Sequence, residues 1–233
     1  TLVQAGHTVY RWDGESTFTI VGSVAAGAKL RGPRQHISAL DGVVIITDLA
    51  KLQPVMIWNG TSFSLLNHNL GGSFYAKYAL VENEIAFYGN VTSGTALPHV
   101  LVASERGDYD DLSVSTRPTV TAAVDSAWFL PTPDLRAING LVEGFGSIVI
   151  GTEKGHLHRL IGQDAFDYRL QTFYLGSAPR GDEALVNVGN DVLIGRAGHI
   201  DSLAGTINFG DVETDDIDRW IQSLTRDVTP GPW

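Results

Sequence analysis

Short apolar runs separated by turn-forming residues make up most of this chain. Residues 43–47, 54–58 and 63–66 are three consecutive runs of this kind. Asn59-Gly60 separates the last two runs, and Asn-Gly between β-prone runs is typical of a hairpin turn because both residues tolerate positive φ. The pattern predicts a unit of short antiparallel strands.

A similar hairpin signal occurs near the start of the sequence. Trp12-Asp13-Gly14 separates the β-prone runs 9–12 and 18–21, just as Trp58-Asn59-Gly60 separates two of the later runs. The two tryptophans are 46 residues apart, which is close to the ~40–50 residues of a propeller blade. We therefore expect a structural repeat, in which Trp12 and Trp58 pack between neighbouring blades.

The buried run that opens each unit also recurs. These runs begin at Val43, Ile85, Ile148 and Val192, at intervals of 42, 63 and 44 residues. The longer interval holds residues 113–133, whose three prolines indicate a long loop or an added strand between blades.

The repeats predict the fold class. We expect an all-β, β-propeller-like domain of about five antiparallel blades over residues 1–210, with an insertion at about 113–133. No opening run precedes Thr8, so the first unit is expected to lack its opening strand. A ring of blades would then close by sharing one blade between the two ends of the chain.

One segment near the C-terminal end has the period of a helix. Asp215 and Asp216 open it, and acidic residues suit the positive end of the helix dipole. Apolar residues follow at helical spacing, namely Ile217, Trp220, Ile221 and Leu224. We predict a short acidic helix and a tail over residues 211–233.

Composition excludes several classes of protein and site. The net charge of −10 leaves no basic footprint for nucleic-acid binding. The absence of cysteine excludes disulfides and thiolate metal sites. No run reaches the ~20 apolar residues of a membrane span. Gly144 and Gly146 do not make a dinucleotide fingerprint, because Val149 stands where a third glycine is needed. We expect no catalytic activity and no cofactor.

Several residues nevertheless admit two interpretations. His156 and His158 share one face of a predicted strand and could begin a metal site with Glu153, but a polar blade face is the simpler explanation. The acidic loops 108–111 and 211–216 suit calcium ligation or a solvated turn. Trp12 and Trp58 could stack on sugars, and a carboxylate pair on such a scaffold could hydrolyse glycosides. We expect no metal site.

Phrases in the second half resemble one protein family. They include an apolar strand followed by Gly-Asp and an aromatic residue, a Thr-Glu-x-Gly hairpin, a Val-Gly-Asn-x-Val-Leu blade and a Phe-Gly-Asp that leads into the acidic segment. They occupy residues 102–112, 135–141, 148–155, 188–200 and 209–211. In this order, over about residues 100–224, they resemble the tail nozzle (tail tube or hub) proteins of short-tailed bacteriophages and related virion ring proteins.

The resemblance implies a structural role without catalysis. Such a protein forms part of an oligomeric tube through which the genome passes, and DNA is a passing cargo that is not bound by sequence. The implied partners are copies of the chain in a ring and other virion tail or connector proteins. The implied location is the virion, with assembly in the host cytoplasm. The alternative is a carbohydrate-binding or glycoside hydrolase-like propeller.

In such an assembly, we expect the acidic C-terminal segment to contact partner subunits. The expected interface residues are Asp211, Asp215, Asp216, Trp220 and Trp233.

Overall fold

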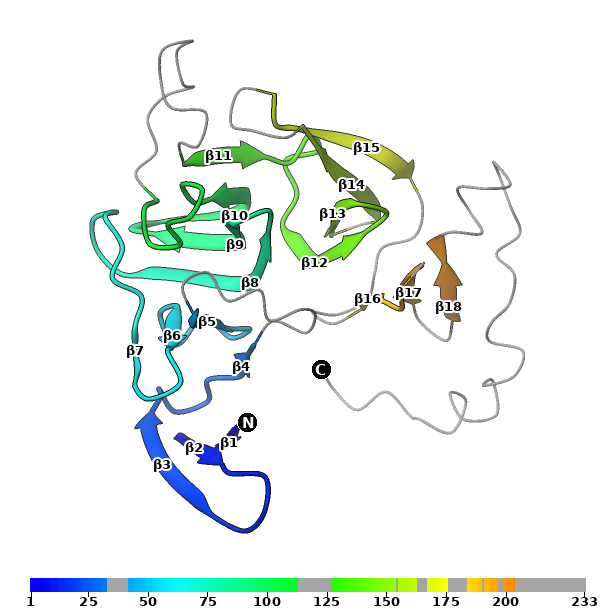
Figure 1. Ribbon diagram of the computed structural model, residues 1–233. Helices are drawn as coiled ribbons and strands as arrows, with labels where there is room; N and C mark the ends of the chain where they lie inside the picture. Colours follow the sequence, from blue (N-terminus) through cyan, green and yellow to red (C-terminus); the bar gives the residue numbers. More distant parts are fainter. Residues whose placement is uncertain are drawn as a thin grey trace. The chain divides into compact units, whose positions relative to one another are not determined.

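The computed structural model describes most of the strand-forming part of the chain (Figure 1). The described residues are 1–32, 42–112, 127–153, 155–162, 167–175, 184–189, 191–196 and 199–203. They form five antiparallel sheets, which confirms the prediction of an all-β fold. The chain divides into two compact units, Thr1–Ile138 with Ile161–Leu170 and Asn139–Leu160 with Gln171–Trp233. Each unit is described by itself.

The first sheet has three strands in the order β1-β2-β3. They are β1 (Leu2–Ala5), β2 (Thr8–Trp12) and β3 (Phe18–Ser23). The predicted hairpin at Trp12-Asp13-Gly14 is confirmed, because Trp12 pairs with Phe18 across the turn. Asp13 Oδ1 accepts hydrogen bonds from the backbone N–H groups of Glu15, Ser16 and Thr17, which closes the turn.

The second sheet has the order β4-β5-β6-β7. Its strands are β4 (Leu30–Arg31), β5 (Val44–Asp48), β6 (Met56–Trp58) and β7 (Phe63–Leu65). Trp58 pairs with Phe63, and Asn59 Oδ1 accepts the N–H groups of Thr61 and Ser62. The hairpins β2-β3 and β6-β7 therefore use the same kind of turn, and the repeat seen in the sequence is a structural one.

The third sheet has the order β11-β10-β9-β8. Its strands are β8 (Phe74–Glu82), β9 (Ile85–Ser93), β10 (Thr95–Ala103) and β11 (Trp128–Pro131). Strand β11 lies inside the predicted insertion at 113–133 and pairs with β10, so this part of the insertion is an added strand. Residues 113–126 of the insertion lie outside the described residues.

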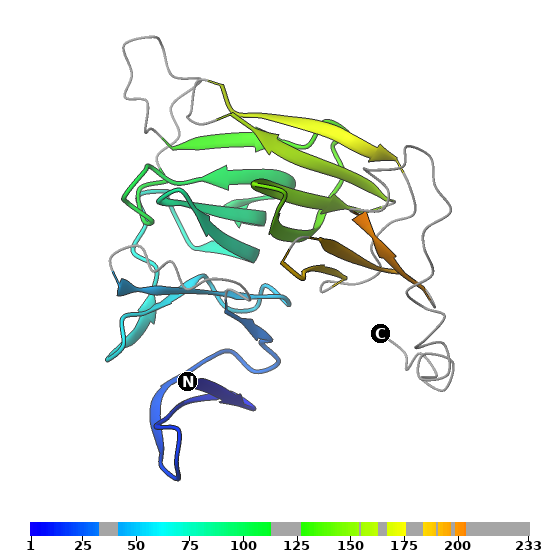
Figure 2. The ribbon, with the colours of Figure 1, turned by 45° about the vertical axis from the view of Figure 1, so that its right-hand side comes forward.

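The three sheets of the first unit pack face to face in chain order, from dark blue to green in Figures 1 and 2. The side chains of consecutive residues of β5 point to opposite faces of the sheet, as in any β-strand. Ile46 joins the core cluster shared with the first sheet, and Ile45 joins the cluster shared with the third. Gly22 of β3 allows close contact, because a Cβ there would lie 2.6 Å from Cδ1 of Phe63.

The turn between β5 and β6 ties the second sheet to the third. The buried Asp48 carboxylate accepts the backbone N–H groups of four residues, Lys29, Ala50, Leu52 and Gln53. This turn places Lys51 Nζ 3.0 Å from Asn90 Oδ1 and 2.9 Å from Thr92 Oγ1 on β9. Burial, and then the charge of the nearby Lys77, lower the pKa of Lys51. The Lys51 side chain is held between the two sheets by the neutral oxygens of Asn90 and Thr92.

The second unit contains most of the fourth sheet and all of the fifth. The fourth sheet has the order β12-β13-β14-β15, with β12 (Ile138–Gly144), β13 (Ser147–Thr152), β14 (His156–Ile161) and β15 (Arg169–Leu175). The fifth has the order β16-β17-β18, with β16 (Leu185–Asn187), β17 (Val192–Arg196) and β18 (His199–Ser202). Val142, Val149 and Leu157 of the fourth sheet share a core with Val192 and Ile194 of the fifth.

Several sequence predictions need correction or fall outside the described chain. The expectation that the first unit lacks a strand before Thr8 is wrong, because β1 pairs with β2 from Leu2 to Ala5. Strands also precede the runs at Val43, Ile85, Ile148 and Val192, which are the second strands of their sheets. The predicted helix at 215–224 and the boundary at 210/211 lie outside the described residues. In the described segments, no helix has the length and apolarity needed to cross a bilayer.

Candidate interaction surfaces

One face of the first sheet is apolar and open to solvent. We call it the front face and define it by five residues, Val3, Tyr10, Trp12, Phe18 and Ile20. The strand register places them together, because Val3 pairs with Tyr10, Tyr10 with Ile20 and Trp12 with Phe18. Phe18 is 55% exposed and Ile20 is 66% exposed. Clusters of exposed apolar side chains are typical of interaction sites.

The aromatic side chains of the front face are already packed against one another. The rings of Trp12 and Phe18 are stacked, with centroids 6.3 Å apart and planes 15° apart. Tyr10 meets the edge of Phe18 at a centroid distance of 6.4 Å. These contacts fix the rings before any partner arrives, so little side-chain entropy is lost on binding.

The second sheet shows what the equivalent positions do when they are covered. Trp58 and Phe63 occupy the hairpin positions of Trp12 and Phe18. They belong to the core shared with the first sheet, where Val9 and Val21 pack nearby. Trp58 is buried, whereas Trp12 is half-buried and contacts Phe18 within its own sheet.

A second apolar face lies on the fifth sheet. We call it the back face and define it by Val186, Val188, Leu193 and Ile200. Val186 pairs with Leu193, and Ile200 is opposite Gly195, two residues further along β17. Val186 is 38% exposed and Val188 is 52% exposed. The other face of this sheet carries the buried residues that pack on the fourth sheet.

The acidic loop that follows β10 is a closed turn. Asp108 Oδ1 accepts the N–H groups of Asp110 and Asp111 at 3.2 and 3.3 Å. Asn69 Nδ2 donates to Asp111 Oδ1 at 2.6 Å, and Tyr88 donates its hydroxyl to the carbonyl of Tyr109. Burial, and then a hydrogen bond and charge from Asp108, raise the pKa of Asp110 to about 6. Burial also raises the pKa of Tyr88. These contacts serve the turn, and we derive no calcium site from them.

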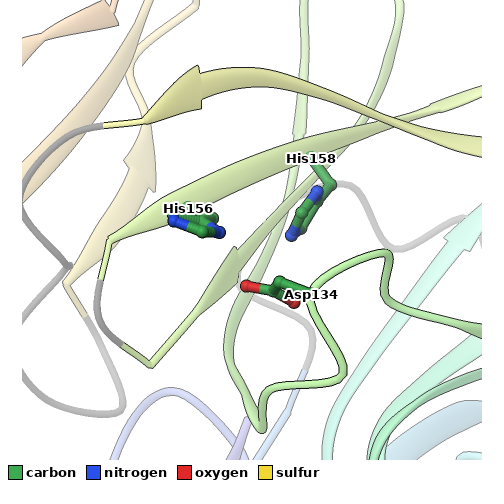
Figure 3. Close-up of side chains that lie close together, drawn as sticks. All are labelled: Asp134, His156 and His158. Carbon is green, nitrogen blue, oxygen red and sulfur yellow. The ribbon is translucent and has the colours of Figure 1, made fainter.

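Two histidines stand side by side on β14 (Figure 3). The rings of His156 and His158 lie 6.2 Å apart between centroids, and His158 Nδ1 is 2.8 Å from Thr172 Oγ1 on β15. The same figure labels Asp134, which belongs to the first unit, where its Oδ1 accepts the N–H of Arg136. A structural zinc site needs four ligands, and the described part of the second unit holds no group of even three.

The residues singled out by the sequence fall into two sets. Trp58 lies in the core between the first and second sheets, and Trp12 lies on the front face. The expected interface residues Asp211, Asp215, Asp216, Trp220 and Trp233 lie outside the described residues.

Sequence reasoning missed most members of both faces. Phe18, Ile20, Val186 and Val188 lie in short runs whose alternation shows two faces but does not tell which face is covered. The only sequence signal that points to the front face is the repeat of Trp12 and Trp58. Trp12 and Trp58 occupy equivalent positions, so a difference in their burial would identify an uncovered end.

No protein family matches the chain, and no curated protein matches it.

Proposed function

We propose that this chain is a structural, non-catalytic subunit of a bacteriophage tail or virion, forming part of an oligomeric tube or nozzle through which the genome passes. We further propose that its five sheets are the blades of a β-propeller-like domain. The order of the phrases between residues 100 and 224 supports the family, and the face-to-face packing of successive sheets supports the blades.

The observation that carries the proposal is the front face. It exposes Phe18 and Ile20 beside the stacked ring of Trp12. Tryptophan and tyrosine are enriched at the energetic centres of protein interfaces. A pre-packed aromatic cluster on a rigid sheet therefore supports a subunit that assembles.

The use of carboxylates supports a structural role over a catalytic one. Asp13, Asp48 and Asp108 accept two or more backbone N–H groups each and thereby close turns. A glycosidase needs two carboxyl groups aimed at one sugar-binding cleft. Carboxylates committed to turns do not supply that arrangement.

The proposed partners are copies of the chain in a ring and other virion tail or connector proteins, in the virion after assembly in the host cytoplasm. The net charge of −10 supports passage of DNA without binding, because a like-charged surface repels the phosphate backbone. DNA would contact the protein only as it passes.

The mass of the native particle tests this function. We expect size-exclusion chromatography with light scattering to give a particle of several copies, and electron-microscope image classes to show rings. A stable monomer at all accessible concentrations would contradict the proposal. If that monomer bound sugars saturably, the exposed ring of Phe18 beside Trp12 would favour the carbohydrate-binding alternative.

A further inference from the structure

We propose that the front face of one copy binds the back face of the next copy, so that copies associate head to tail. This inference rests on the proposed function, because it assumes that the chain is an oligomeric subunit, and it names the two surfaces that meet. The front face consists of Val3, Tyr10, Trp12, Phe18 and Ile20, and the back face of Val186, Val188, Leu193 and Ile200.

The front face is equivalent in position to a covered face in the same chain. Trp58 and Phe63 of the second sheet stand at the hairpin positions of Trp12 and Phe18. What covers Trp58 is the apolar face of the preceding sheet, which contributes mainly aliphatic side chains. By the same packing, the front face should receive the mainly aliphatic face of a preceding sheet.

A face of this kind lies on the fifth sheet, in the second unit. The fifth sheet packs its inner residues, including Val192 and Ile194, on the fourth. Its other side is the back face, whose apolar side chains are aliphatic and whose Val186 and Val188 are exposed. Ser202, which is opposite Leu193 and donates its hydroxyl to the Asp191 carboxylate, adds a polar margin to this face. The back face is therefore the type of surface that covers Trp58 inside the first unit.

The difference between the two faces favours a head-to-tail geometry. The two faces differ in composition, so a two-fold pairing of like with like leaves one of them open. A heterologous contact uses both, and it closes into a ring when the rotation per subunit allows it.

A stable contact between copies must be larger than the two apolar faces. A stable interface buries about 800 Å² on each partner, with about 20–30 residues a side. The nine residues of the two faces are too few to supply all of that area. They are instead its apolar centre, where a few aromatic anchors provide most of the binding energy. The surrounding loops complete the rim.

Two blocked variants and their mixture test the contact. Ile20→Glu puts a charge on the front face, and Val188→Glu puts one on the back face. We expect each variant alone to be monomeric, because each chain lacks one of the two surfaces. An equimolar mixture should give a particle of two chains and nothing larger, because one intact front face meets one intact back face. Leu135→Glu is the matched control, since Leu135 is 68% exposed and belongs to neither face.

The outcomes separate this inference from the proposed function. A monomeric wild-type protein overturns both. An oligomeric wild type with a Val188→Glu variant that still associates overturns only the head-to-tail contact, since front faces would then pair with each other. A mixture that stays monomeric also overturns it, provided that circular dichroism and urea unfolding show both variants folded.

Disulfide trapping gives a second measurement that does not depend on blocking the faces. The chain has no cysteine, so Ile20→Cys and Val188→Cys introduce single thiols. Oxidation of the mixture should give a covalent dimer of one chain of each variant. If Ile20→Cys chains cross-link to each other and no covalent dimer of Ile20→Cys with Val188→Cys forms in the mixture, the proposal is contradicted.

Discussion

Aspartate and asparagine side chains close the turns of this protein by accepting backbone N–H groups. Asp13 and Asn59 do so at the two hairpins of the repeat, and Asp48 does so in the turn that carries Lys51. The settings differ, because the Asp48 side chain is buried and that of Asp13 is exposed. Exposed N–H groups can turn to water when the carboxylate is lost, whereas the part-buried N–H groups around Asp48 have less access to water.

Replacing Asp48 with alanine should therefore destabilise the first unit. The Asp48→Ala variant leaves four backbone N–H groups without their acceptor, and we expect a loss of roughly 3 kcal/mol in the free energy of unfolding. Urea unfolding followed by tryptophan fluorescence measures it. Asp13→Ala is the control and should lose much less. Equal losses in the two variants would show that burial does not set the cost.

Asp110 should make stability depend on pH in the weakly acidic range. Its pKa is raised to about 6, above the ordinary value of 3.8 expected in the unfolded chain. Between these values the folded chain binds more protons, so the contribution of Asp110 is present at low pH and is lost as pH rises through about 6. Asp110→Asn should remove this dependence. The urea midpoint of the variant, minus that of the wild type, should increase from about pH 4 to pH 7. A constant difference would refute the assignment.

At the scale of elements, close packing between sheets depends on glycine at defined strand positions. Gly22→Ala would place a methyl group 2.6 Å from the Phe63 ring, and we expect a loss of about 1–3 kcal/mol through overpacking. Gly71→Ala is the matched control, because a Cβ at Gly71 meets nothing within 4 Å. Thermal unfolding of the two variants checks this. A Gly22→Ala variant as stable as Gly71→Ala would show that the first two sheets are less tightly packed than described.

The elements also show what the sequence could and could not predict. The hairpins after Trp12 and Trp58 were predictable because Asx-Gly turns act locally. The first strands of the sheets were missed. Two of them, β4 and β16, have only two and three residues, which are too few to show a period. The sequence did not decide between a loop and an added strand at β11. The prolines of the insertion weaken the strand signal, and the pairing of β11 with β10 is a long-range contact.

The front and back faces could not be predicted from the sequence either. Phe18 and Ile20 alternate with Thr19 as a half-buried strand should, and only the packing of Val9 on the second sheet shows that their side is the outer one. The uncovered face is thus a property of packing between sheets, which a local pattern does not record.

At the scale of the whole molecule, charge and apolar surface act in opposite directions on assembly. Copies with a net charge of −10 repel one another, and the exposed faces attract. Salt screens the repulsion, since the screening length falls from about 30 Å at 0.01 M to about 10 Å at 0.1 M. It does not weaken the burial of apolar surface.

Association through the front and back faces should therefore strengthen as salt is added. We expect sedimentation velocity at one protein concentration to show a rising fraction of assembled particles between low and moderate ionic strength. The Ile20→Glu variant should stay monomeric throughout, because screening does not restore its apolar face. An assembly held by ion pairs would behave in the opposite way, since screening weakens exposed ion pairs. Dissociation of the wild type on adding salt would thus assign the contact to charged residues rather than to the two apolar faces.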